Sequence, residues 1–187
     1  MIAAAASLYI ADGAVVADVT WGKGLFWRKA GPGRFRLAGS DISGHGLPRL
    51  RADFRQLPYA DGSVDVVVLD PPYLTYGGSH ESAARYGLSH TRNMNHDGIM
   101  AMYRDGMTES RRVLRRGGQL WVKCKDQVGN HVQYWSHIEL HATAAALGFS
   151  AKDLFVLVAS GPVDYDRWPS QHHARKTHSF LWIFTRP

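Results

Sequence analysis

The sequence contains little cysteine and no long apolar run. Cys124 is the single cysteine among 187 residues, so no internal disulfide can form, which is typical of a chain that folds in a reducing cytoplasm. No stretch approaches the roughly 18 consecutive apolar residues of a membrane-spanning helix. The apolar start MIAAAASLYI lacks a preceding basic segment, and we expect no signal peptide there. These absences predict a cytoplasmic protein rather than a disulfide-rich secreted domain or a membrane protein.

Acidic residues are also scarce relative to basic ones. Asp and Glu number 16 against 22 Lys and Arg, which gives a formal net charge of +6 and a pI of about 9.6. A basic surplus favours polyanionic partners such as nucleic acid, although many basic proteins bind none. No internal repeat, low-complexity tract or linker is present, so residues 1–187 are expected to form one domain.

Short apolar segments alternate with segments of helical spacing, which is typical of an α/β sheet covered by helices. The residues Gly117 and Gly118 are expected to end one helix, and Ser136 to cap the next. The expected strands are 14–18, 35–40, 49–53, 64–69, 119–124, 154–159 and 179–185, and the expected helices are 2–10, one starting at 25, 99–116 and 138–147.

A glycine-containing turn, DVTWGKG, follows the first expected strand. It places Asp18, Gly22 and Gly24 between a strand and a helix start. Glycine allows positive φ and close approach of a ligand to the backbone, and a following helix offers its first N–H groups to an anion. Two glycines also occur in ordinary tight turns, so both interpretations stay open.

Carboxylates end three of the expected strands: Asp18, Asp41 and Asp53. Asp41 lies about 20 residues beyond the glycine turn, where an acid hydrogen-bonds ribose hydroxyls in nucleotide sites. Asp53 is placed to accept a hydrogen bond from an adenine amine. Trp27 replaces the third glycine of a dinucleotide motif and no P-loop is present, so we expect a nucleoside ligand without phosphate and with a cationic group.

The stretch VVVLDPPY ends a buried strand with Asp70, Pro71, Pro72 and Tyr73. Asp and Pro are common in plain turns, but this combination also suits an amine on a flat ring. A base amine is a poor nucleophile because its lone pair is delocalised. The Asp70 carboxylate and the Pro71 carbonyl can accept both of its N–H groups, and Tyr73 can stack on the base, which contributes about 1–3 kcal/mol.

These motifs resemble the class I S-adenosylmethionine-dependent methyltransferases, and among them the enzymes with a DPPY motif that methylate amines of nucleic-acid bases. The final THSFLWIF also resembles the last strand of that family. The resemblance implies a Rossmann-like, doubly wound, mostly parallel seven-stranded sheet with an antiparallel last strand, S-adenosyl-L-methionine as cofactor, and no metal. It implies catalytic roles for Asp70, Pro71, Pro72 and Tyr73, and cofactor contacts for Asp18, Thr20, Gly22, Gly24, Phe26, Asp41, Asp53 and Phe54.

Two long polar segments, 74–97 and 161–178, interrupt the strand and helix pattern. Loops of this length in a compact domain are usually functional or disordered. Because the chain has no room for a separate recognition domain, we expect these segments, a second copy of the chain or a specificity subunit to recognise the substrate. The candidate substrate-binding residues are Tyr73, Arg85, Arg92, Arg167, Trp168, Arg175 and Lys176.

Several substrates fit this pattern. Adenine N6 in DNA is the favoured target, because the motif begins with Asp. Cytosine N4 in DNA and a base amine in RNA remain alternatives, as do a protein amide and a nucleic-acid-binding module without activity.

Three further groups of residues have ordinary structural interpretations. Lys123 and Lys125 could contact phosphate, but a solvated strand edge is favoured for both. His137 and His141 have a metal-compatible spacing, yet no Cys or Glu completes a known pattern. Phe26 and Trp27 could line the cofactor pocket, although an aromatic pair at a helix start more often belongs to the core.

Overall fold

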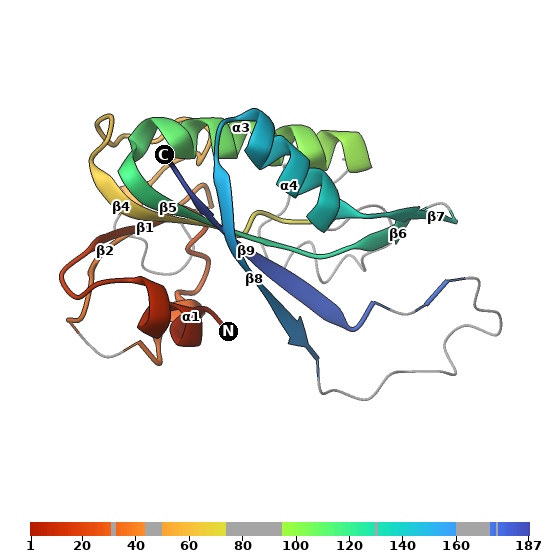
Figure 1. Ribbon diagram of the computed structural model, residues 1–187, viewed down its shortest axis with the longest axis horizontal. Helices are drawn as coiled ribbons and strands as arrows, with labels where there is room; N and C mark the ends of the chain where they lie inside the picture. Colours follow the sequence, from red (N-terminus) through yellow and green to blue (C-terminus); the bar gives the residue numbers. More distant parts are fainter. Residues whose placement is uncertain (31–32, 44–49, 74–94, 130, 160–172, 175) are drawn as a thin grey trace.

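The computed structural model describes residues 1–30, 33–43, 50–73, 95–129, 131–159, 173–174 and 176–187 (Figure 1). A seven-stranded sheet with the order β3-β2-β1-β4-β5-β9-β8 forms the centre of the molecule. The first five strands in this order, from β3 to β5, pair in parallel. Strand β9 is antiparallel to both of its neighbours, β5 and β8. The expected mostly parallel sheet with an antiparallel last strand is confirmed. The strands are β1 Val15–Asp18, β2 Arg36–Asp41, β3 Leu50–Arg51, β4 Val64–Leu69, β5 Leu114–Cys124, β8 Ser150–Val158 and β9 His178–Thr185.

Helices cover both faces of the sheet (Figure 1). On one face lie α3 (His96–Val113) and α4 (Ser136–Ala146), and on the other lie α1 (Ile2–Tyr9) and the 3-10 helix η1 (Leu25–Trp27). The central strand β4 is buried from both sides, with Val67 and Leu69 in the core under α3 and Val66 and Val68 in the core under α1. Strands buried on both faces are near-continuously apolar, which explains the sequence VDVVVL. None of the described helices is long and apolar enough to cross a membrane.

The junction between α3 and β5 differs from the expectation. The helix ends at Val113, and Leu114 already has extended backbone with φ −68° and ψ 136°. Gly117 and Gly118 therefore lie inside β5 and do not end the helix. A Cβ atom on Gly118 would lie 3.0 Å from the carbonyl oxygen of Asp65 on the neighbouring strand, so glycine is needed there for close strand approach.

Two other local expectations were wrong. The segment after Gly24 forms a three-residue 3-10 helix rather than an α-helix, and such a short element has no row of free N–H groups for an anion. Ser136 is the first residue of α4 and not its cap, and the His137 N–H in the first turn donates instead to the Asp126 carboxylate at 3.2 Å. A small antiparallel hairpin, β6 (Gln127–Gly129) and β7 (Val132–Tyr134), was not expected and precedes α4.

Candidate active site at the carboxyl ends of the strands

The candidate site lies where the strand order reverses, between β1 and β4. In open α/β sheets, ligands bind at this switch point, beyond the carboxyl ends of the strands. The loop after β1 is held against the end of β4, because Val19 N–H donates to the Val68 carbonyl at 3.1 Å and Asp70 N–H donates to Thr20 Oγ1 at 2.8 Å. Thr20 thus positions the backbone of Asp70.

Asp70 forms an ion pair with Lys123 of the adjacent strand. Leu69 pairs with Val122 in the sheet, so Asp70 and Lys123 each follow that pair by one residue. Lys123 Nζ lies 3.0 and 3.2 Å from the two Asp70 carboxylate oxygens, and the side chains of Lys123 and Asp70 are only 13% and 15% exposed. The expectation of a solvated edge at Lys123 was therefore wrong: this lysine belongs to the candidate site.

Burial and pairing have opposite effects on these two groups. Burial raises the pKa of Asp70 above its ordinary value, and the Lys123 ammonium opposes that rise. Burial by itself lowers the pKa of Lys123, but the Asp70 carboxylate and the hydrogen bonds with Asp70 and Tyr73 outweigh it and hold that pKa above its ordinary value. Lys123 therefore stays charged and favours the ionised form of Asp70.

Aromatic rings surround the ammonium group of Lys123. Its Nζ atom lies 5.3 Å from the ring centre of Tyr73 and 5.7 Å from that of Phe26, both within cation–π range. The Lys123 backbone is also held in place, because the buried Tyr103 hydroxyl donates to the Lys123 carbonyl at 2.8 Å. Asp70, Tyr73 and Phe26 thus meet around one cation.

Asp18 ends β1 and is fully buried. Its carboxylate accepts hydrogen bonds from the Trp27 indole N–H at 2.8 Å and from the Thr20 N–H at 3.3 Å. The pKa of Asp18 is raised from 3.8 to about 7: burial raises it most, the two hydrogen bonds oppose that rise, and the negative charges of Asp70 and Asp41 add to it. The structure therefore shows Asp18 supporting the turn and η1, and its predicted direct contact with a cofactor stays a prediction.

Asp41 stabilises the glycine turn from the end of β2. Its Oδ2 atom accepts from the Gly22 N–H at 2.9 Å, and its Oδ1 atom accepts from the N–H and hydroxyl of Ser43 at 2.8 and 2.5 Å. Asp41 is half-buried and Gly22 is exposed. A carboxylate has about four acceptor positions, and three are in use here, so Asp41 retains capacity for about one further hydrogen bond from a ligand hydroxyl.

The Trp21 indole explains two of the glycines near the turn. A Cβ atom on Gly24 would lie 2.8 Å from this ring, and one on Gly39 of β2 would lie 2.5 Å from it. Gly24 also has φ +64°, which favours glycine. The close approach expected for a ligand at Gly24 is therefore made by Trp21 in this structure, whereas Gly22, with φ +52°, has no side chain within 4 Å of its Cβ position.

Asp53 and Phe54 follow the short strand β3. The Asp53 carboxylate pairs with Arg55, whose Nη2 atom lies 2.6 Å from Asp53 Oδ2. Phe54 is buried in the core against Gly106 of α3, where a Cβ atom would lie 2.7 Å from the Phe54 ring. An adenine contact by either residue stays a prediction, since Asp53 has an internal partner and Phe54 packs inside the domain.

Most of the predicted substrate-binding residues lie outside the described residues: Arg85, Arg92, Arg167, Trp168 and Arg175. Lys176 is described, and its Nζ atom lies 5.1 Å from the ring centre of Trp135, just before α4. Trp135 is half exposed. A basic and an aromatic side chain therefore meet at this point, but Trp135 was not among the residues expected there, and substrate binding by Lys176 stays a prediction.

The two histidines with metal-compatible spacing have other partners. His137 Nδ1 lies 2.7 Å from Oδ1 of the buried Asp126, and its ring stacks on Phe180. His141 lies against Trp182. In the part of the chain that the structure describes, no group of three or more His, Cys, Asp or Glu side chains could hold a metal ion.

Neither protein-family models nor curated protein sequences give a match to this chain. Solved structures do. A SAM-dependent methyltransferase from Methanosarcina mazei superimposes with a TM-score of 0.61 and 12% identity, over 96% of this chain and 95% of that protein. The cyclase SpnF gives a TM-score of 0.61 and 15% identity, over 95% and 77%. A candidate DNA modification methylase from Thermus thermophilus gives 0.51 and 17%, over 73% and 52%.

These similarities define the class of fold. The chain has the Rossmann-like fold of class I S-adenosylmethionine-dependent methyltransferases, in a single domain. It spans about half the length of the Thermus protein. The match to a cyclase shows that the fold also occurs in a protein named for other chemistry, so the activity of this chain has to be argued from its site.

Proposed function

We propose that this protein transfers a methyl group from S-adenosylmethionine to an exocyclic amine of a nucleic-acid base, with adenine N6 in DNA as the favoured substrate. The observation that carries the proposal is Asp70, a carboxylate held at the switch point by Thr20 and Lys123 and followed by Pro71, Pro72 and Tyr73. The methyltransferase fold of the solved neighbours supports it, as does the basic charge of the chain.

The residues at the ends of β1, β2 and β4 fit a nucleoside cofactor without phosphate. Asp18, Asp41 and Asp70 place three carboxyl groups at one edge of the sheet, and each of the other two raises the pKa of Asp18. Such an edge disfavours phosphate and favours hydroxyls, an amine and a cationic sulfonium. Asp41 and the exposed Gly22 would hold the cofactor, while Asp18 supports the turn from inside.

When bound, S-adenosylmethionine supplies an electrophilic methyl group on its sulfonium sulfur. Asp70 would accept one N–H of the target amine and the Pro71 carbonyl would accept the other, which would localise the nitrogen lone pair for attack on that methyl group. The nitrogen–carbon bond would form as the sulfur–carbon bond breaks, leaving S-adenosylhomocysteine, and the methylated nitrogen would then lose one proton to solvent. Tyr73 stacks on the base and offsets part of the few kcal/mol that extrusion from a duplex costs. Positioning of this kind can contribute about 7–11 kcal/mol to catalysis.

Lys123 is compatible with this role for Asp70. The ammonium occupies one side of the carboxylate, and a carboxylate can accept several hydrogen bonds at once. Because burial alone favours the protonated form of Asp70, the lysine charge favours the ionised form, which accepts hydrogen bonds.

The test is incubation of the full chain with methyl-labelled cofactor and separate pools of DNA and RNA, followed by mass analysis of the nucleosides. Labelled N6-methyl-2′-deoxyadenosine from DNA is the expected product. Label in N4-methyl-2′-deoxycytidine or in ribonucleosides from RNA would redirect the proposal to the corresponding substrate. Absence of label from both pools, together with no thermal shift by S-adenosylhomocysteine, would overturn it in favour of a module without activity.

A further inference from the structure

A strongly basic pocket lies at the amino ends of the parallel strands, opposite the candidate active site. It has a volume of about 560 Å³, and its lining includes Arg111, Arg112, Arg115, Arg116 and Arg186, together with Asp61. These arginines come from the last turn of α3, the start of β5 and the segment after β9. Leu114 pairs with Val64 and Val122 pairs with Leu69, so Arg115 and Lys123 are separated by about five residues of β4, or roughly 17 Å.

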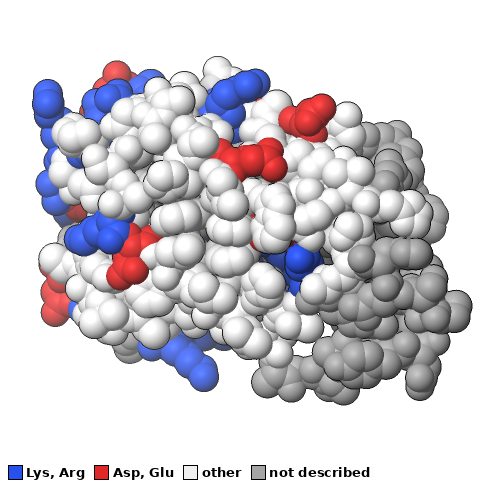
Figure 2. Space-filling view, turned by 45° about the vertical axis from the view of Figure 1, so that its right-hand side comes forward, with Lys and Arg blue, Asp and Glu red and all other residues white. Residues whose placement is uncertain are grey.

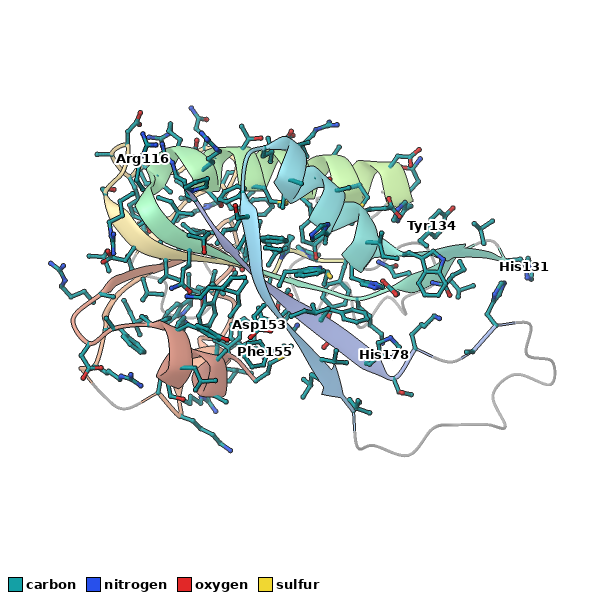
Figure 3. All side chains as sticks on the ribbon, in the orientation of Figure 1. Arg116, His131, Tyr134, Asp153, Phe155 and His178 are labelled. Atoms are coloured by element: carbon teal, nitrogen blue, oxygen red, sulfur yellow. The ribbon has the colours of Figure 1, made fainter. Side chains whose placement is uncertain are left out.

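Figure 3 shows where Arg116, one residue of this pocket, lies in the molecule. Figure 3 labels Arg116 at the end of the molecule where the C-terminus lies, far from Tyr134 and His131 of the β6–β7 region. In Figure 2, basic and acidic side chains gather toward the left-hand margin, whereas the middle of that face carries few charged side chains. The arginine pocket therefore lies well away from the β6–β7 end of the molecule.

Two of the five arginines have a complete structural explanation. Arg112 pairs with Glu109 and Asp61 at 2.6 Å each and donates to the carbonyls of Leu57 and Tyr59. Arg115 pairs with Asp65, which also accepts from the N–H of the first residue of β1. These ion pairs connect Asp61, before β4, to the end of α3 and connect Asp65, in β4, to the start of β5.

The other three arginines are not neutralised in this way. Among the described residues, Arg111, Arg116 and Arg186 form no ion pair with a carboxylate, and the buried Nε atoms of Arg111 and Arg186 have no hydrogen-bond partner. Arg186 is held in place through one Nη atom, which donates to the Leu114 carbonyl. With three acids against five arginines, the cluster keeps a surplus of two positive charges.

Such a surplus is unfavourable without an anion. A guanidinium stays charged at any physiological pH, and unpaired donors in a partly buried site lose hydration without compensation. Phosphate oxygens match the fork geometry of guanidinium groups and form charge-assisted hydrogen bonds with them. The volume is larger than one phosphate needs and fits several linked phosphate groups.

We propose that this arginine pocket binds phosphate groups of a polyanion, with Arg111, Arg116 and Arg186 as the donors and Arg112 and Arg115 as the scaffold. The phosphates come either from a free polyphosphate or from the backbone of a nucleic acid. The inference stands apart from the proposed methyl transfer, because it concerns binding at the amino ends of the parallel strands.

The test compares two charge-matched double variants of the full chain. Arg111→Gln with Arg116→Gln removes two donors from the pocket. Arg104→Gln with Lys152→Gln removes two positive charges from exposed positions elsewhere. Binding of tripolyphosphate and of a single-stranded DNA oligonucleotide is measured by calorimetry at several salt concentrations. Thermal unfolding checks that each variant is folded, and the exposed Arg116→Gln change alone serves as the milder pocket variant.

We expect the pocket variant to bind at least about tenfold more weakly than the control, since it loses charge-assisted hydrogen bonds from two guanidinium groups. Weakening toward tripolyphosphate identifies free polyphosphate as a ligand. Weakening toward the oligonucleotide, with a salt slope reduced by about 1.4 for two lost phosphates, identifies the nucleic-acid backbone. Equal binding by pocket and control variants, or no binding of either probe to the unmodified chain, overturns the proposal.

Discussion

Lys123 Nζ lies 3.0 Å from Asp70 Oδ2 and joins the carboxyl ends of β4 and β5. Within the described residues, this pair is the point at which the candidate catalytic acid, two aromatic rings and the loop after β1 come together. Breaking a buried pair by removing one partner leaves a charge without compensation. The pair therefore links the stability of the site to its charge state.

Replacing Asp70 by Asn is expected to lower methyl transfer by roughly 10²–10⁴-fold, because an amide is a weaker acceptor than a carboxylate and presents N–H donors to the target amine. Binding of S-adenosylhomocysteine should be retained, since Asp41 and Gly22 are unchanged. Initial rates and calorimetry measure the two effects. The matched control is Asp12→Asn at an exposed position, and equal rates for both variants would exclude a catalytic role for Asp70.

Replacing Lys123 by Met is expected to move the acidic limb of the pH–rate profile to higher pH. The ammonium lowers the pKa of Asp70 while burial raises it, so its loss leaves the raised pKa unopposed. Because activity needs an ionised Asp70, the variant loses activity on acidification at a higher pH than the unmodified protein does. Lys123→Arg should keep the limb near its original position. A limb that does not move in Lys123→Met would contradict an electrostatic role for the lysine.

Asp18 is expected to make the stability of the protein depend on pH. Its pKa rises from 3.8 to about 7 on folding, so between these values the folded state holds a proton that the unfolded state has lost. The contribution of Asp18 to stability is full below about pH 4 and decreases as pH rises toward 7, by about 4 kcal/mol in total.

Asp18→Asn removes this titration. Urea unfolding at pH 5 and pH 8 should show the variant gaining stability relative to the unmodified protein at the higher pH. The exposed Asp97→Asn serves as the control. A difference in the free energy of unfolding that is the same at both pH values would show that Asp18 does not titrate in this range.

Gly39→Ala is expected to destabilise the fold by about 1–3 kcal/mol, because the added methyl group would lie 2.5 Å from the Trp21 ring. Trp21→Leu alone loses ring contacts, but in combination it should remove much of the cost of Gly39→Ala. A double-mutant cycle of unfolding free energies measures this coupling. Additive effects would show that Trp21 does not fill the space beside Gly39 in solution.

The positions of the strands along the chain follow from local patterns in the sequence. Apolar segments such as VDVVVL form strands because both faces of a central parallel strand are buried, and carboxylates end β2 and precede the proline pair after β4 where the chain leaves the sheet. The junction at Leu114 was not predictable in this way. Helical spacing continues to Arg116, and only the pairing of Leu114 with Val64 of β4 ends the helix earlier.

The candidate site shows the same division. Asp70, Pro71, Pro72 and Tyr73 stand out in the sequence because their chemistry is carried by four consecutive residues. Lys123 does not, although a lysine within the apolar run LWVKC was a signal of an unusual environment. Its role depends on the register between β4 and β5, which joins residues 53 positions apart.

The sequence by itself determined the class of fold and the location of the acids, since both depend on periodicity and on residues adjacent in the chain. Only the tertiary structure decided which acids have buried partners, that Trp21 rather than a ligand lies beside Gly24, and that five arginines share one pocket. These properties come from contacts between distant segments, whose distances and burial fix the charge of each group.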